Sequence, residues 1–194
     1  MDNIAASLQE WMKGFGRDGS VEIEMQLKNV SKTTFKHLMS KLKRTGGWEA
    51  VQATETLDRF FPSFLRTSCN MSTGEETHTV KTRLKDPLDL TLGSVGVRFH
   101  AKKEKILKSS DPLVLRHAAS RHLSSRHKQR VSFRTATGFV YDLTRVKNER
   151  GRVTYEVELE WAGQNTALDL EAATQSFIRQ TENLVALVQW YTSH

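Results

Sequence analysis

Apolar and polar residues alternate along several stretches of this chain, and the alternation has the period of a β-strand. In Val21-Glu22-Ile23-Glu24-Met25 the odd positions are apolar and the even positions are charged. Because successive side chains point to opposite faces of a strand, each such stretch has one apolar face and one polar face. Eight stretches are predicted as strands: 21–28, 48–60, 65–70, 77–85, 95–107, 126–134, 139–147 and 155–161.

Four other stretches have helical spacing. Ser31 is a candidate N-cap for a helix in which Phe35, Leu38 and Leu42 share one face. Asp111-Pro112 predicts a helix that continues to about residue 123, since proline is favoured at the first helical position. Shorter and longer amphipathic helices are expected over 3–13 and about 168–191. Short connections between many strands predict an antiparallel-rich α+β domain, built as a meander or a barrel.

The charges on the polar faces are sorted by strand. Glu156, Glu158 and Glu160 follow one another on one face of the last predicted strand, and the face containing Arg126, Lys128 and Arg130 is cationic. A single polar face is most simply a solvated sheet surface. Like charges repeated on one strand are poor for a plain surface, however, because they repel. We therefore also consider that these faces point inward, around a polar lumen with carboxylates for a hard divalent cation and cations for phosphates.

Composition narrows the classes of protein. The 194 residues suit one domain, and a net charge of +7 with a pI of about 9.6 favours polyanionic partners. No apolar run could cross a bilayer, so no membrane partner is expected, and the first residues lack the pattern of a secretory signal. Cys69 is the single cysteine, which suits a reducing compartment. Walker loops, dinucleotide-binding glycine motifs and zinc-ligand spacings are missing from the sequence.

The acidic and basic motifs together resemble those of the triphosphate tunnel metalloenzymes, in particular the fungal, protozoan and viral RNA 5′-triphosphatases of mRNA capping. The resemblance covers roughly residues 20–161 and is carried by Glu22-Ile-Glu24, Arg126-His-Lys128-Gln-Arg130-Val-Ser132, Phe139-Val-Tyr-Asp142-Leu-Thr144 and Glu156-Val-Glu158-Leu-Glu160. Arg66, Lys81-Thr-Arg83 and Arg98-Phe-His100-Ala-Lys102-Lys-Glu104 also fit. It implies one tunnel domain over 1–194, with a closed eight-stranded antiparallel β-barrel, flanking helices and a supporting C-terminal helix.

The resemblance also implies roles for individual residues. The expected ligands of Mg²⁺ or Mn²⁺ are Glu22, Glu24 and Glu160. The expected phosphate-binding residues are Arg66, Lys81, Arg83, Arg98, Arg126, Lys128 and Arg130. Glu104, as the residue that orients the attacking water, joins Glu158, Arg98, Lys128 and Arg130 in the expected catalytic set, and Glu156, Asp142, Thr144 and Ser132 are expected to support it.

The implied activity is removal of the γ-phosphate from 5′-triphosphate RNA, with an mRNA guanylyltransferase as a possible partner and a monomer or homodimer as the assembly. A nuclear location follows from that role, or cytoplasm or virion for a viral protein. Gln26 departs from the wider superfamily, which favours lysine there, and this argues mildly against thiamine or inorganic triphosphatases. Two alternatives stay open: a tunnel hydrolase of inorganic, nucleoside or thiamine triphosphate, and a non-catalytic phosphate- or RNA-binding β-domain.

Overall fold

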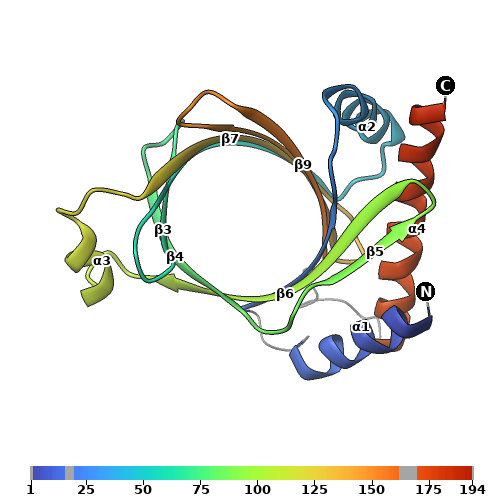
Figure 1. Ribbon diagram of the computed structural model, residues 1–194, viewed down its shortest axis with the longest axis horizontal. Coiled ribbons are helices and arrows are strands. Elements are labelled where there is room, and N and C mark those ends of the chain that lie inside the picture. The colour runs from blue at the N-terminus through green and yellow to red at the C-terminus, as the bar shows by residue number, and fades with distance from the viewer. Residues whose placement is uncertain (1, 16–19, 162–169, 194) are drawn as a thin grey trace.

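The computed structural model describes residues 2–15, 20–161 and 170–193. Its centre is a closed antiparallel β-barrel in which eight strands follow the order β1-β9-β8-β7-β2-β3-β4-β6, and pairing of β1 with β6 closes the ring. The barrel strands are β1 (Val21–Leu27), β2 (Ala50–Phe60), β3 (Leu65–Asn70), β4 (Glu76–Arg83), β6 (Val95–Leu107), β7 (Ser124–Arg134), β8 (Phe139–Asn148) and β9 (Val153–Trp161). Figure 1 looks through the ring along its axis. The expected eight-stranded barrel is therefore confirmed.

A ninth strand, β5 (Leu88–Leu92), was not predicted. It pairs only with the first half of β6, beside the place where β1 joins β6 on its other edge. Leu88, Leu90 and Leu92 pack against the core, while Asp89 and Thr91 point away from it. β5 extends the sheet outside the ring and leaves the barrel closed.

Helices cover one side of the barrel. Figure 1 shows α1 (Asp2–Phe15), α2 (Lys32–Thr45) and α4 (Leu170–Ser193) together on that side, with the short α3 (Pro112–His117) on the opposite side. Ser31 caps α2 as expected, since its hydroxyl accepts a hydrogen bond from the backbone N–H of Thr34 at 3.0 Å. Among the described residues no helix combines the length and apolar character needed to cross a bilayer.

Two helix boundaries differ from the prediction. α3 ends at His117 and not near residue 123, because the backbone N–H of Leu123 already bonds to the carbonyl of Phe60 at 2.7 Å and so leads the chain into β7. α1 continues to Phe15, past the predicted end at residue 13. The predicted start of the last helix at 168 lies outside the described residues.

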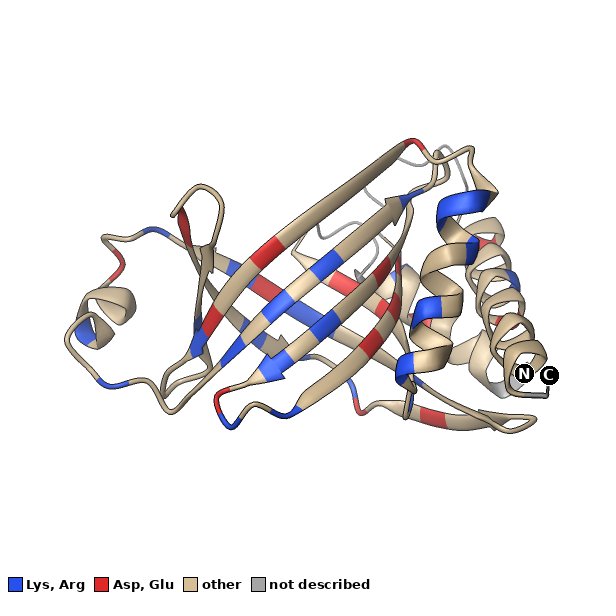
Figure 2. Ribbon diagram, turned by 90° about the horizontal axis from the view of Figure 1, so that it is seen from above, with Lys and Arg blue, Asp and Glu red and all other residues tan. Residues whose placement is uncertain are grey.

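The main hydrophobic core lies outside the ring, between the barrel wall and the helices. Ile23 and Met25 of β1, Phe99 of β6 and Phe177 of α4 are all fully or almost fully buried there. The ring of Phe177 lies 5.8 Å from that of Phe99 and 5.9 Å from that of Phe139, measured between centroids. Since the apolar faces of these strands turn outward to the helices, their polar faces must turn into the barrel. Figure 2 shows the resulting bands of acidic and basic residues across the strands.

Candidate active site

The lumen of the barrel holds a polar cavity of about 200 Å³. All its lining side chains are charged or amide-bearing, and they come from seven of the eight barrel strands. They are Glu22, Glu24, Gln26, Arg66, Lys81, Lys102, Arg126, Lys128, Arg130, Asp142, Glu156, Glu158 and Glu160. The inward direction expected for the alternating polar faces is thus what the structure has.

The carboxylates form one wall of this cavity, on the neighbouring strands β1 and β9. Glu24 lies directly across from Glu160, and Gln26 lies across from Glu158 with its amide nitrogen 3.4 Å from a Glu158 oxygen. Burial, together with the charges of Glu22, Asp142 and Glu24, raises the pKa of Glu160 to about 8. Burial and the charge of Glu24 likewise raise the pKa of Glu158 to about 7. The wall therefore carries more negative charge than the buried site accommodates without a further cation.

Two lysines neutralise part of this wall. Lys81 lies between two glutamates, with its ammonium nitrogen 2.6 Å from Glu22 and 2.7 Å from Glu104. Lys102 forms an ion pair with Glu24. Glu104 also accepts a hydrogen bond from Arg66 at 2.9 Å. Although burial acts to raise it, the pKa of Glu104 is lowered because Lys81 and Arg66 stabilise the carboxylate.

Arg130 is held toward the lumen by a network on β7 and β8. Its guanidinium lies 2.6 Å from Asp142 and 3.6 Å from Glu158, and it donates a hydrogen bond to the Thr144 hydroxyl at 3.0 Å. Ser132 donates to the other oxygen of Asp142 at 2.5 Å. Asp142, Thr144 and Ser132, expected as supporting residues, therefore all contact Arg130 or its carboxylate partner.

Asp58 is an important residue of the lumen that the sequence reasoning missed. Its side chain is 1% exposed and lies 3.3 Å from Arg126 and 3.6 Å from Lys128. Burial and the neighbouring Arg130 lower the pKa of Lys128 to about 8, against the opposing attraction of Asp58. The alternation along β2 could have identified it. Asp58 is the one acidic residue among the inward-facing positions of β2, which also include Thr54 and Thr56.

Two residues expected at the phosphates are not among those that line this cavity. Arg98 occupies an inward-facing position of β6, but its guanidinium donates hydrogen bonds to both oxygens of Asp89 on β5 at 2.6 Å. Arg83, at the end of β4, is exposed. Arg66, Lys81, Arg126, Lys128 and Arg130 do line the cavity.

The lumen continues toward one end of the barrel. A second polar cavity of about 180 Å³ shares Asp142 and Glu160 with the first and is otherwise lined by Ala50, Gln52, Ser132, Arg134 and Val140. The cations of the first cavity lie on β3, β4, β6 and β7, whereas its glutamates lie on β1 and β9. A ligand in the lumen would thus meet carboxylates from β1 and β9 and guanidinium and ammonium groups from the strands on either side of them.

The donor set of the acidic wall suits a hard divalent cation, since it offers carboxylate oxygens and no sulfur or imidazole. Glu22 and Glu160 both have raised pKa values, with burial as the largest cause. Within the described residues no three His, Cys, Asp or Glu side chains have an arrangement that could hold a metal as they lie. Lysines instead bind two of the three expected ligands, Glu22 and Glu24.

Comparison with solved structures identifies the fold. The S. pombe Pct1 RNA triphosphatase, solved in complex with the Spt5 CTD, aligns with a TM-score of 0.75 over 94% of this chain and 90% of its own, at 16% identity. The triphosphatase of the Mimivirus capping enzyme aligns with a TM-score of 0.72 over 97% and 98%, at 13% identity. A putative adenylyl cyclase from Hippeastrum, HpAC1, described as having a dominant triphosphatase activity, gives 0.50 over 84% and 87%, at 14% identity.

This chain therefore has the fold of the tunnel-shaped triphosphatases, and it matches the RNA triphosphatase structures over nearly their whole length. No protein-family model matches the sequence, and no curated protein matches it either.

Proposed function

We propose that this protein is a metal-dependent RNA 5′-triphosphatase, which hydrolyses the γ-phosphate of 5′-triphosphate RNA to give 5′-diphosphate RNA and phosphate. The observation that carries this proposal is the closed lumen with a carboxylate wall on β1 and β9 and cations on β3, β4, β6 and β7. Neutralising the phosphate oxygens is the main task in phosphoryl transfer to water, and both halves of the lumen serve it.

Glu22, Glu24 and Glu160 would hold Mg²⁺ or Mn²⁺. The metal would supply a positive charge on the γ-phosphate oxygens. It would also satisfy the excess negative charge that now raises the pKa of Glu160 to about 8.

The cations of the chain bind and orient the phosphates. Arg130 can present a fork of N–H donors because Asp142 and Thr144 hold its guanidinium in place. Lys128 and Arg126 add charge beside it, and Asp58 limits their mutual repulsion. Glu104, kept ionised by Lys81 and Arg66, is the proposed acceptor for a proton of the attacking water. Water attacks the γ-phosphorus and the bond to the bridging β–γ oxygen breaks, so the 5′-diphosphate end leaves.

The test is release of phosphate from RNA with a labelled γ-phosphate, with and without Mn²⁺ or Mg²⁺. Glu22→Gln, Glu24→Gln and Glu160→Gln should each reduce metal-dependent release by about 100-fold or more, since each removes a proposed metal ligand. Glu10→Gln is the matched control, because this carboxylate is exposed on α1. Full activity in a folded variant of Glu22, Glu24 or Glu160 would contradict its assignment as a ligand.

A second candidate is hydrolysis of free triphosphates, such as tripolyphosphate or a nucleoside triphosphate. The observation in its favour is that the cavity is lined only by charged and amide side chains, which recognise phosphates and not bases. The higher TM-scores to the RNA triphosphatases support the RNA substrate. Turnover on tripolyphosphate, ATP and triphosphate RNA at equal concentrations decides between them. Absence of hydrolysis on all three, with phosphate binding retained, would instead support a non-catalytic binding domain.

The proposed activity also leads to a proposed setting. It places the protein with an mRNA guanylyltransferase, which would use the diphosphate end, and in the nucleus or, for a viral protein, in the cytoplasm or virion. Co-purification with a guanylyltransferase would test the partnership.

A further inference from the structure

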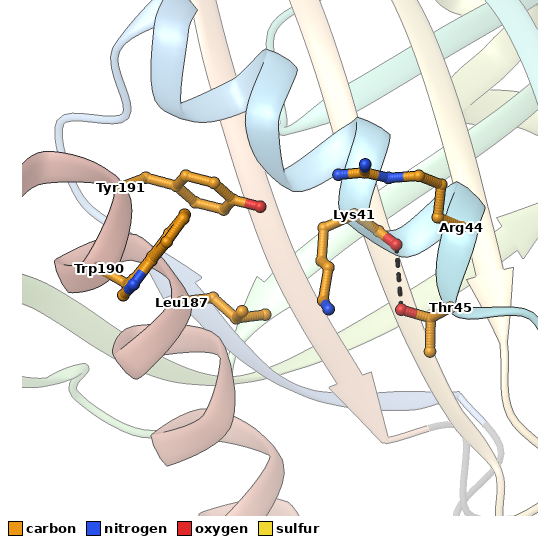
Figure 3. A pocket seen from close by; sticks show the side chains of 6 residues that line it. All are labelled: Lys41, Arg44, Thr45, Leu187, Trp190 and Tyr191. Carbon is orange, nitrogen blue, oxygen red and sulfur yellow. Dashed lines mark hydrogen bonds between the residues drawn. The ribbon is translucent and has the colours of Figure 1, made fainter. Parts of the chain in front are cut away.

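A groove of about 590 Å³ lies outside the barrel, between α2 and α4, and it has no part in the lumen. Lys41, Arg44 and Thr45 of α2 form one side, and Leu187, Trp190 and Tyr191 of α4 form the other. Figure 3 shows the two aromatic rings projecting from α4 toward the side chains of α2, with the Lys41 ammonium between the helices. Aromatic faces and cations are thus presented together at the surface.

The aromatic side of the groove is a fixed platform. Trp190 is 56% exposed, which is unusual for so large an apolar side chain. Its ring lies 4.8 Å from that of Tyr191 at an angle of 78°, and the Tyr191 ring lies 4.6 Å from that of His37 on α2. Rings braced in this way can stack on a planar ligand with little loss of conformational freedom.

The charge of the groove favours an anionic partner. α2 carries Lys32, Lys36, Lys41, Lys43 and Arg44 and no acidic residue, and in α4 no acid follows Glu182. Figure 2 shows these basic positions spaced along α2. Side chains that offer both stacking rings and phosphate-binding cations are the features by which proteins hold single-stranded nucleic acid without reading its sequence.

We propose that this groove binds the single-stranded body of the RNA whose triphosphate end enters the lumen, an inference that rests on the proposed RNA substrate. An acidic peptide would use the cations but leave the exposed tryptophan unexplained. A second copy of the chain would bring together two α2 helices whose charged residues are all basic, and repulsion between these like charges opposes that contact.

The groove is close enough to the barrel for one RNA strand to use both sites. Thr45 lines the groove and Ala50 lines the end of the lumen that contains Arg134. Four residues lie between them, so the five steps along the chain place them at most about 18 Å apart. An RNA longer than a few nucleotides can therefore reach from one site to the other, whereas tripolyphosphate cannot.

The experiment measures binding of a 3′-labelled oligouridine of 20 nucleotides with a 5′-hydroxyl end, by fluorescence anisotropy over a range of salt concentrations. The missing triphosphate separates this groove from the lumen. Trp190→Ala should weaken binding about fivefold or more through lost stacking. The double variant Lys41→Gln, Arg44→Gln should lower the slope of log affinity against log salt by about 1.4, or about 0.7 for each lost cation. The double variant Lys108→Gln, Arg116→Gln, near and in α3 on the far side of the barrel, is the matched control.

The same variants are then assayed for hydrolysis. The groove variants should raise KM for long triphosphate RNA and leave tripolyphosphate hydrolysis unchanged. Unaltered oligouridine binding and unaltered KM would overturn the proposal, as would Trp190→Ala changing only the oligomeric state in light scattering. A polyglutamate peptide that binds the groove better than oligouridine would also overturn it. Loss of hydrolysis on every substrate with groove binding intact would instead contradict the proposed function alone.

Discussion

Lys128 is the lumen cation whose charge depends most on pH in the working range. It faces Asp58 from β2, Arg126 and Arg130 on its own strand and Arg66 from β3, and burial among these groups lowers its pKa to about 8. As pH rises through 8, the Lys128 ammonium of the free enzyme loses its proton. The lumen then loses one positive charge and part of its attraction for phosphate. We therefore expect kcat/KM for a triphosphate substrate to fall above about pH 8, since this ratio reports groups of the free enzyme.

Lys128→Arg tests this directly because a guanidinium stays charged. The alkaline fall in the pH profile of kcat/KM should move upward in Lys128→Arg, and it should stay in place in the exposed control Lys108→Arg. An unchanged profile in Lys128→Arg would assign the fall to another group.

Asp58 should act as a positioning residue for the same cations. In Asp58→Asn the attraction that opposes burial is removed, so the pKa of Lys128 should fall below 8 and the alkaline fall should move to lower pH. The double variant Asp58→Asn, Lys128→Arg should lack that shift. Asp58→Ala should in addition lower the free energy of unfolding by about 3 kcal/mol, because it leaves buried charges without their partner. Denaturant unfolding measures the cost, and a purely structural role would change stability without moving the pH profile.

For single residues, the alternation of inward and outward side chains along a strand explains what could be predicted from the sequence. Glu22, Glu24 and Glu158 alternate with apolar neighbours that the helices bury, so their inward direction follows from the strand period alone. Asp58 was missed because no described helix packs on the outward face of β2. The outward residues of this strand are mostly polar or small, so they do not form the apolar alternation that would mark Asp58 as inward. Which cation pairs with which carboxylate depends on register around the ring, and alternation within one strand does not fix that register.

Among the elements, β5 gives the clearest consequence for function. It brings Asp89 against Arg98 and Lys28, at 2.6 Å and 2.8 Å, at the edge of the sheet outside the ring. Leu88–Leu92 has only five residues and follows Pro87, so its short alternation did not stand out as a strand. The register of β6 places Arg98 on the inward face, but the partner that β5 supplies draws its guanidinium away.

This pairing predicts a difference between two arginines that the sequence motif treats alike. Arg98→Ala should reduce kcat/KM less than about fivefold, as expected for an exposed ion pair. Arg130→Ala, which removes a guanidinium fixed inside the lumen, should reduce it about 100-fold or more. Steady-state kinetics on triphosphate RNA measures both. A loss in Arg98→Ala as large as that in Arg130→Ala would mean that Arg98 leaves Asp89 to contact the phosphates.

For the whole molecule, closure of the barrel is the property that the motifs predicted and the structure bears out. Pairing of β1 with β6 leaves the lumen no side entrance between strands, so a ligand must enter from an end. The central cavity of about 200 Å³ is lined by ion pairs between different strands, such as Lys81 of β4 with Glu22 of β1. A chain of phosphates can lie in such a passage, whereas a nucleoside would have to displace these pairs.

Capped RNA tests this consequence of closure. Its triphosphate bridge has a nucleoside at both ends, so one nucleoside would have to pass through the lumen before the phosphates could reach Arg130 and Glu160. We expect no hydrolysis of capped oligonucleotides under conditions in which the same oligonucleotide with a free 5′-triphosphate is fully converted to the diphosphate, with chromatographic separation of the products as the measurement. Tripolyphosphate, which has no bulky end, is the control for passage. Cleavage of the capped substrate at a comparable rate would mean that the barrel opens during turnover, and the closed ring would then be only one of its states.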